Sequence, residues 1–337
     1  MEDKMSENLR EAWAEKCVII GAHTVLGRLL IQAMEDDPAV DEFFVIDLHA
    51  PENLNSKKLN FIQLDLIAPG ADSLLAKELE RMGAKSIIHC ALKDNPSLNW
   101  VYAHELEVIG TMNLVSAAKA AKVKKFILCS STCIYGASAK NPNYIPESQG
   151  PTRAPSAHYV KDKIEAEKQV IKLFSEAPEI VCTLLRFCFV VGPRSSNYFI
   201  DLLRRPLVPS LLGYDPLMQF IHEEDALDAL LLAIKNDHAG EFNIVGKGVI
   251  PLSYALRLAK RLKIPLFSAI AYPSIQFLWN MQMIAVPGRL LDYLKFLWVA
   301  DGTKAKQIMN FEAKRTSKEA FLDFANSHQE ERLEKAS

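Results

Sequence analysis

The sequence predicts an α/β protein: a Rossmann-type, doubly wound parallel sheet followed by a smaller, mostly helical C-terminal substrate lobe. Two observations lead to this prediction. Up to Gly192, short apolar runs that suit buried strands alternate with stretches of helical length, a pattern typical of βαβ units. Beyond Gly192 prolines interrupt the chain and helical stretches then dominate, which indicates a second region.

Each predicted strand is a short, mostly apolar run. These runs cover residues 17–21, 43–47, 61–65, 86–90, 125–130 and 180–187. Continuous apolar runs of this kind are typical of strands covered on both faces. The predicted helices between them are residues 25–34, 71–82, 105–121 and 159–176. In a sheet built this way, ligands bind at the carboxyl ends of the strands.

The same pattern sets the expected domains. Residues 16–192 are predicted to form the dinucleotide-binding Rossmann domain, and segments near 221–247 return to it as a helix and a strand. Residues 193–220 and 248–330 are predicted to form the substrate-binding lobe.

Composition excludes several classes of protein. The chain has 337 residues, of which 49% are hydrophobic and 24% charged, so a disordered, collagen-like or coiled-coil protein is not expected. The formal net charge is −2 and there is no long basic run, so nucleic acid is not an expected partner.

The remaining features favour a cytoplasmic protein. The acidic N-terminal residues do not have the pattern of a secretory signal. Six cysteines lie scattered in apolar stretches and form no metal-binding pattern, so we expect buried free thiols and no metal. Residues 264–288 contain no Asp, Glu, Lys or Arg, but three prolines interrupt them, so no transmembrane span is expected.

The first predicted strand runs directly into Gly21-Ala-His-Thr-Val-Leu-Gly27, which opens a helix. Glycines in such a turn let the backbone approach a pyrophosphate, whose charge the helix N-terminus stabilises. Thr24 stands where the usual motif has its middle glycine. Taken alone, the run therefore suits either a cofactor loop or an ordinary strand-to-helix turn.

Carboxylates end the next two predicted strands. Asp47 is placed to accept hydrogen bonds from both adenosine ribose hydroxyls and to repel a 2′-phosphate, and no arginine follows it, which favours NAD over NADP. Asp65 is expected within reach of the adenine amino group. Either residue alone also suits a solvated strand end, but the two together favour a dinucleotide site.

A catalytic group is suggested by Tyr159-Val-Lys-Asp-Lys163, whose i, i+4 spacing places Tyr159 and Lys163 on one helix face. We expect the ammonium of Lys163, with a positive nicotinamide, to lower the pKa of the Tyr159 phenol toward neutral pH. Upstream, Thr132 follows a buried strand and is expected to hydrogen-bond a substrate oxygen. Taken alone, Tyr159 and Lys163 also suit an exposed pair on a helix surface, and Thr132 also suits a hydroxyl-rich turn without a catalytic role.

Read along the chain, the motifs are Gly21-x5-Gly27, Asp47, Asp65-Leu66, His89-Cys-Ala91, Gly110-Thr111-x-Asn113, Ser130-Ser-Thr132, Tyr159-x3-Lys163, Arg186-x5-Gly192-Pro193 and Phe220-Ile-His222-x2-Asp225. Their order resembles that of the extended short-chain dehydrogenase/reductase family, and within it the NAD-dependent epimerase/dehydratase branch. The resemblance covers roughly residues 16 to 326.

The resemblance implies hydride transfer at C4 of a nicotinamide. Tyr159 would act as acid/base, Lys163 would bind the nicotinamide ribose, and Thr132 would polarise the reacting oxygen. The implied NAD-binding residues are Gly21, His23, Thr24, Val25, Leu26, Gly27, Asp47, Asp65, Leu66, Cys90, Ala91, Tyr159, Lys163 and Phe187. The family also implies a small-molecule substrate and a possible homodimer.

Three positions depart from the family pattern. Thr24 replaces the middle glycine, and Glu107 stands where the family often has an asparagine that serves a water-linked proton relay. Cys133-Ile134 follows Thr132 where dehydratases usually carry Asp-Glu, so 4,6-dehydration is disfavoured.

Three functions remain open. The first is epimerase-type chemistry on a sugar-nucleotide-like substrate, whose diphosphate would need cations. The candidate cations are Arg194, Arg204, Arg205 and Arg257. The second is a dehydrogenase or ketoreductase acting on an apolar alcohol or ketone, similar to 3-beta-hydroxysteroid dehydrogenases, which the uncharged residues 264–288 favour. The third is a non-catalytic NAD-binding sensor.

Overall fold

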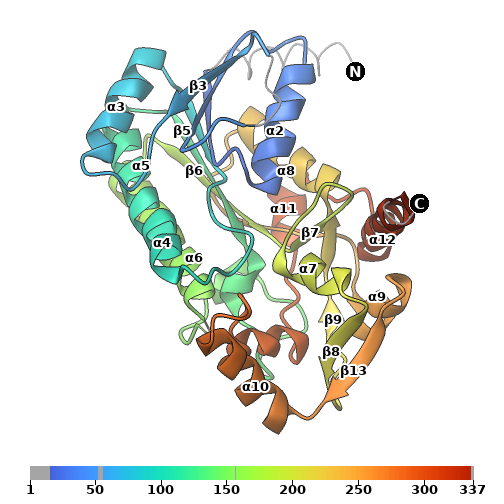
Figure 1. Cartoon of the computed structure of the whole chain (residues 1–337). Coiled ribbons are helices and arrows are strands. Elements are labelled where there is room, and N and C mark those ends of the chain that lie inside the picture. The colour runs from blue at the N-terminus through green and yellow to red at the C-terminus, as the bar shows by residue number, and fades with distance from the viewer. Residues whose placement is uncertain (1–15, 52–55, 156, 335–337) are drawn as a thin grey trace.

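A seven-stranded parallel sheet forms the centre of the molecule (Figure 1). The structure is a computed structural model and describes residues 16–51, 56–155 and 157–334. The strand order is β3-β2-β1-β4-β5-β6-β11, and each neighbouring pair runs parallel. The order reverses between β1 and β4, which is the kind of switch point where such sheets bind ligands. The predicted doubly wound fold is confirmed.

The strands of this sheet follow the predicted apolar runs closely. They are β1 (Cys17–Ile20), β2 (Phe43–Asp47), β3 (Leu59–Gln63), β4 (Ser86–His89), β5 (Lys125–Ser131), β6 (Val181–Phe187) and β11 (Gly240–Ile244). The third strand lies two residues earlier than predicted, so Asp65 belongs to the loop that follows it. The pairing of β11 with β6 brings the chain back to the main sheet after Gly192.

Helices cover both faces of the sheet. Successive side chains of a strand point to opposite faces, so strands that are apolar throughout need a covering layer on each side. Val18 and Ile20 pack into one layer and Ile19 into the other. The first layer contains α3 (Ala71–Met82), α5 (Gly110–Ala120) and α6 (His158–Glu176). The second contains α2 (Val25–Asp36), α8 (Glu223–Lys235) and α11 (Thr303–Ile308). The packing of α11 here places part of the expected substrate lobe against the main sheet.

The helix predicted over residues 105–121 has a more complex form. It consists of α4 (Trp100–His104), one π-helical turn (Glu105–Ile109) and α5. A π-helical turn widens the backbone ring and often marks a functional site. Here it turns the side chain of Glu107 into the protein interior, where it is 2% exposed.

The C-terminal lobe is mainly helical, with three small two-stranded sheets. Its helices are α7 (Tyr198–Arg204), α9 (Leu252–Leu258), α10 (Ser268–Asn280) and α12 (Ser317–Glu334). Its sheets pair β7 (Phe189–Val191) with β10 (Phe220–His222), β8 (Leu207–Leu211) with β13 (Leu262–Leu266), and β9 (Leu217–Met218) with β12 (Ile250–Pro251). An aromatic core that includes Phe199, Phe220 and Phe321 holds these pieces together.

Two further expectations are tested by the fold. All six cysteines are free and buried, as predicted. Of the helices in the described part of the chain, none is long and apolar enough to cross a membrane.

A buried ion pair joins α6 to the sheet. The guanidinium of Arg186, on β6, donates to the carboxylate of Glu167 from Nε at 3.1 Å and from Nη2 at 2.7 Å. Its Nη1 donates to the hydroxyl of Tyr135 at 3.0 Å, and that hydroxyl donates to Asn243 on β11 at 2.7 Å. The Arg186 and Glu167 side chains are only 2% and 0% exposed, so each charge depends on the other.

We predict that Glu167→Ala destabilises the protein strongly, because Arg186 would then be a buried charge without its carboxylate. The expected loss is roughly 3–5 kcal/mol in the free energy of unfolding, measured by urea denaturation. Glu165→Ala removes an exposed pair with Lys168 on the same helix and is the matched control, with an expected loss of about 0.5 kcal/mol or less. Equal losses for the two variants would contradict the prediction.

Candidate functional site

The turn between β1 and α2 has the geometry of a dinucleotide-binding loop. Gly21 has a φ of +92°, and an added Cβ would lie 2.5 Å from the backbone nitrogen of Ala91, so only glycine fits there. A Cβ at Gly27 would lie 2.1 Å from the carbonyl oxygen of Gly21, so this position also requires glycine. Both glycines of the predicted motif therefore allow close backbone packing at the start of α2.

Thr24 is the N-cap of α2, which explains the missing middle glycine. Its Oγ1 accepts a hydrogen bond from the backbone N–H of Gly27 at 3.1 Å and donates to the carbonyl of Gly21 at 3.0 Å. A threonine at this position satisfies a free N–H group of the helix, which glycine would leave open. The departure from the family motif thus stabilises the same turn by another route.

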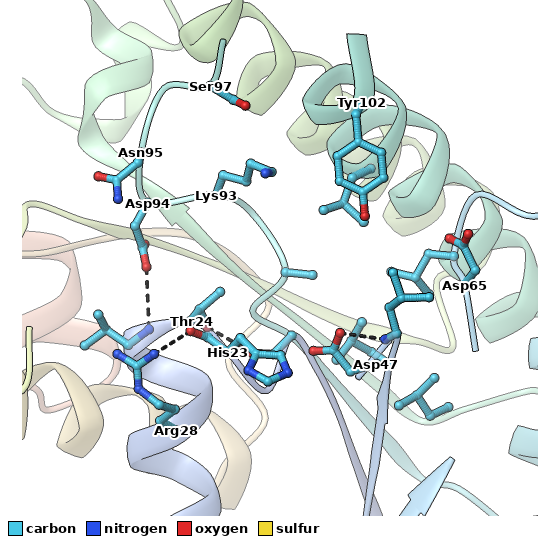
Figure 2. Close-up of a pocket in the computed structure, with 18 of the residues that line it drawn as sticks. His23, Thr24, Arg28, Asp47, Asp65, Lys93, Asp94, Asn95, Ser97 and Tyr102 are labelled. Carbon is cyan, nitrogen blue, oxygen red and sulfur yellow. Dashed lines mark hydrogen bonds between the residues drawn. The ribbon is translucent and has the colours of Figure 1, made fainter. Parts of the chain in front are cut away.

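Asp47 lies at the end of β2 beside this loop. Its Oδ2 accepts from the N–H of Ala22 at 2.8 Å, and its Oδ1 accepts from the N–H of Leu48 at 2.7 Å. Each carboxylate oxygen has a second lone pair, so the side chain retains the capacity to accept ribose hydroxyls. Figure 2 shows Asp47 and Asp65 on the same side of the cavity, away from Asp94.

A cavity of about 400 Å³ lies at the carboxyl edge of the sheet between these groups (Figure 2). The predicted cofactor residues that line it are Gly21, His23, Thr24, Val25, Asp47, Asp65, Leu66 and Ala91. Gly27 does not line it, because its role is to pack against Gly21.

A second, smaller cavity of about 80 Å³ adjoins the first and shares Thr24 and Val25 with it. The predicted residues on its wall are Leu26, Cys90, Tyr159, Lys163 and Phe187. The structure therefore brings the predicted tyrosine and lysine together next to the cofactor loop. The ammonium of Lys163 lies 4.5 Å from the centroid of the Tyr159 ring.

Thr132 does not lie in this cavity. It begins a 3-10 turn (Thr132–Tyr135) after β5, is 1% exposed, and borders a separate small pocket together with Trp298. The hydroxyl residues that line the cavity beside Tyr159 and Lys163 are Ser130 and Ser131, the last two residues of β5. The hydroxyl of Thr132 is buried and has no hydrogen-bond partner among the described residues, so its predicted role toward a substrate oxygen stays a prediction.

The pKa of Tyr159 shifts in the direction opposite to the one expected. Burial raises this pKa well above its usual value, and the nearby Cys133 adds to the effect. Lys163 does not reverse the shift, because its ammonium lies over the ring face and donates to other groups. In this arrangement the phenol keeps its proton and donates to the carbonyl of Asp94 at 3.2 Å.

Glu107 forms a buried ion pair with Lys163. The ammonium donates to Glu107 Oε1 at 3.3 Å and to the carbonyl of Lys93 at 2.7 Å. The same carboxylate oxygen accepts from the N–H of Lys93 at 2.8 Å, so one acidic side chain holds both the lysine and the segment after β4. Burial raises the pKa of Glu107, and the positive charge of Lys163 opposes this shift.

The segment after β4 lies across the two cavities. Its Asp94 side chain points toward the N-terminal end of α2, where Oδ2 is 3.5 Å from the N–H of Val25 (Figure 2). The backbone carbonyls of Lys93 and Asp94 accept the hydrogen bonds from Lys163 and Tyr159. The segment therefore contacts the cofactor loop and the predicted catalytic side chains at the same time. Burial raises the pKa of Asp94, with Lys163 opposing.

Several residues of the site were not predicted from the sequence. They are Arg28, Lys93, Asp94, Tyr102, Ser131 and Tyr198. The polar run Lys93-Asp94-Asn95 begins four residues after the buried strand β4 ends at His89, and this position near the carboxyl edge of the sheet was the one sequence signal for Lys93 and Asp94.

A third cavity, of about 350 Å³, lies on the other side of Tyr159. Its wall includes Trp100, His158, Trp279 and Arg289. The rings of Trp100 and His158 are stacked with centroids 4.6 Å apart. The uncharged stretch at 264–288 contributes to this wall through α10.

The four arginines considered as diphosphate ligands lie elsewhere. Arg194 pairs with Glu223 at 2.9 Å, and Arg204 pairs with Asp201 at 2.8 Å. Neither these two nor Arg205 and Arg257 line any of the three cavities.

Three features at the carboxyl edge of the sheet are typical of dinucleotide-dependent proteins. They are the glycine turn at Gly21 and Gly27, the carboxylate of Asp47 at the end of β2, and the pair of Tyr159 and Lys163. The chain belongs to the NAD dependent epimerase/dehydratase family, whose model matches residues 17–245. The expected cofactor, NAD, is the cofactor of this family.

Individual relatives are distant. The chain is 29% identical over 315 residues to an uncharacterized protein of Mycobacterium tuberculosis, covering 91% of this chain and 82% of that protein. It is 27% identical to dTDP-D-glucose 4,6-dehydratase of Bos taurus (75% and 73% covered) and 25% identical to the decarboxylating sterol-4-alpha-carboxylate 3-dehydrogenase of Mus musculus (66% and 60%). The solved structure of UDP-glucose 4-epimerase from Thermotoga maritima is similar in fold, with a TM-score of 0.71 at 18% identity and 94% and 99% of the chains covered.

We predict that Asp94→Asn tightens the binding of NADH. A negative charge at the N-terminus of α2 competes with the pyrophosphate for the same N–H groups, and its removal should lower the Kd by about fivefold. The wild-type affinity should fall as the pH rises through the raised pKa of Asp94, because the carboxylate is neutral below that pH and negative above it.

Fluorescence titration of NADH at a series of pH values, from the ordinary pKa of an aspartate at about 4 up to about pH 8, measures both effects. The Asp94→Asn variant should lose this pH dependence. A Kd that is the same for both proteins at all pH values would contradict the prediction.

Proposed function

We propose that the chain is an NAD-dependent oxidoreductase that moves a hydride to or from a carbinol or ketone carbon of a small molecule. The observation that carries the proposal is the wall shared by Ser131, Tyr159 and Lys163, beside the cofactor loop and Asp47. When bound, NAD supplies the nicotinamide carbon that accepts or gives the hydride. The remaining steps depend on the chain's own residues.

Tyr159 is the acid/base in this proposal. It takes the proton of the substrate hydroxyl on oxidation and returns it on reduction. Its hydrogen bond to Asp94 and that of Lys163 to Lys93 occupy the donors needed for this step. When the segment of Lys93 and Asp94 moves aside, the Lys163 ammonium becomes free to stabilise the phenolate and so to lower the pKa of Tyr159.

Ser131 takes the role first expected of Thr132. Its side chain borders the same cavity as Tyr159, and its Oγ accepts a hydrogen bond from the N–H of Cys133 at 3.2 Å, which leaves the hydroxyl proton available. That proton can be donated to the reacting oxygen. Glu107 fixes Lys163 at the base of the cavity, in place of the asparagine relay.

Two classes of substrate differ in what they need from the third cavity. A sugar nucleotide needs cations for its diphosphate, and Arg289 is the arginine on this wall, since none of the four arginines considered above lines it. A ring-containing, mostly apolar alcohol or ketone suits the aromatic rings of Trp100 and Trp279, and Arg289 can meet one anionic group on it. Epimerase-type chemistry on a sugar nucleotide is the first candidate function. The aromatic wall of the cavity supports a second candidate, a dehydrogenase or ketoreductase that acts on an apolar alcohol or ketone.

We predict that Tyr159→Phe lowers kcat by about 10²- to 10⁴-fold, because the acid/base group is lost. The assay monitors the nicotinamide absorbance and product isomers with UDP- and dTDP-sugars and with cyclic apolar alcohols and ketones. NADH binding by the variant should change little, because phenylalanine keeps the aromatic ring that lines the cavity.

Unchanged turnover in Tyr159→Phe would overturn the proposed mechanism. Stoichiometric NAD binding without turnover of any substrate in the panel would instead favour the sensor function. Tightly retained NAD with isomerised product would indicate an epimerase, whereas net formation or use of NADH would indicate a dehydrogenase.

We predict that Ser131→Ala and Thr132→Val differ in their effects. Ser131→Ala should lower kcat by about 10- to 100-fold with little change in stability, because it removes a donor to the reacting oxygen. Thr132→Val keeps the β-branched shape and removes a hydroxyl that has no hydrogen-bond partner among the described residues, so it should leave kcat within about threefold. Kinetics and thermal unfolding of both variants test the assignment, and the reverse order of effects would restore Thr132 to the catalytic role.

A further inference from the structure

Helix α10 exposes an apolar face. Phe267, at its N-cap, and Ile270, Phe277 and Met281 follow one another at helical spacing and lie on the same side of the helix. They are 64%, 60%, 61% and 57% exposed, respectively. Large apolar side chains gathered on one face at this exposure are uncommon on a soluble monomer and indicate an interaction site.

The opposite face of α10 is anchored to the protein. Gln276 and Trp279 line the third cavity, and the hydroxyl of Tyr272 donates to Asp292 at 2.6 Å. Ala271 is buried against the C-terminal core. The helix is therefore a wall with the cavity on one side, and its apolar outer face belongs to a fixed element.

The neighbouring strand β13 extends the apolar surface. It pairs only through β8 in the described sheets, and Leu262 and Ile264 on it are 68% and 36% exposed. Leu207, opposite Leu262 on β8, is 48% exposed. Figure 1 shows β8, β13 and α10 together at one end of the molecule, remote from β3. We call the exposed apolar residues of α10 and β13 the apolar patch; they are Phe267, Ile270, Phe277, Met281, Leu262 and Ile264.

The segment that carries the apolar patch contains basic residues but no acidic ones. The 50 residues from Phe242 to Leu291 contain no Asp or Glu, although the whole chain has a net charge of −2. The basic residues in this segment are Lys247, Arg257, Lys260, Arg261, Lys263 and Arg289. Lys260 and Lys263 are exposed beside the patch and form no ion pair with the residues that the structure describes.

We propose that the apolar patch docks on the surface of a lipid bilayer that carries anionic headgroups. An apolar helix face flanked by basic residues is suited to the headgroup boundary, where the apolar side chains leave water and the ammonium groups meet lipid phosphates. A second copy of the chain would bring two segments of like charge together, which opposes self-association. This surface is separate from the catalytic residues, so the proposal does not depend on the proposed function.

The test is co-sedimentation of the full chain with vesicles. One set contains phosphatidylcholine alone and the other contains about 30% phosphatidylglycerol. We expect binding to the anionic vesicles that weakens as salt is raised, and much weaker binding to the neutral ones.

Two double variants examine the two parts of the patch. Phe267→Ser with Phe277→Ser should abolish sedimentation with either vesicle. Lys260→Gln with Lys263→Gln should reduce binding to the anionic vesicles by about fivefold per lysine. Leu74→Ser and Lys77→Gln, both on the exposed side of α3, are the matched controls and should bind like the wild type. Thermal unfolding checks that each variant is folded.

Three results would overturn the proposal. They are no sedimentation with either vesicle, equal binding to both vesicles at all salt concentrations, and equal loss of binding in the α3 controls. If the protein does not bind vesicles but forms a concentration-dependent dimer, and if Phe267→Ser with Phe277→Ser abolishes that dimer, the patch would be assigned to contact with a second copy instead.

Discussion

The buried guanidinium of Arg186 on β6 is paired with Glu167 on α6, and this ion pair fixes the position of the helix that carries Tyr159 and Lys163. Glu167 lies on the same face of α6 as the site residues, four residues after Lys163 and eight residues after Tyr159. Through Tyr135, the same network holds the turn after β5, which follows Ser131. One buried charge pair therefore fixes the elements that carry the three side chains of the proposed chemistry, and local hydrogen bonds to Glu107, Lys93, Asp94 and Cys133 orient the side chains themselves.

Much of the fold could be predicted from the sequence, because strands buried on both faces leave a clear apolar signal. The runs at Cys17 and Phe43 and the carboxylate of Asp47 illustrate this. The site was less predictable. Ser130, Ser131 and Thr132 are neighbours of similar chemistry, and the sequence does not reveal that the first two line the cavity beside Tyr159 while Thr132 borders another pocket. The pKa of Tyr159 depends on burial and on where Lys163 donates, neither of which spacing reveals.

The segment after β4 links the two halves of the site. Asp94 approaches the start of α2 through its side chain and Tyr159 through its carbonyl, while Lys93 accepts from Lys163. Glu107 holds both Lys93 and Lys163 from the π-helical turn. Any ligand that displaces this segment from the start of α2 therefore also changes the hydrogen bonds of Tyr159 and Lys163, the proposed catalytic pair.

The cap of α2 has a consequence for how the cofactor is received. Because the hydroxyl of Thr24 already satisfies the N–H of Gly27, the first turn of the helix is ordered by the chain itself. A loop that is ordered beforehand loses little conformational entropy when a ligand arrives, and it does not fray when the ligand leaves. With threonine in place of the glycine, the turn at the start of α2 is therefore expected to keep its conformation between binding events instead of folding around its ligand.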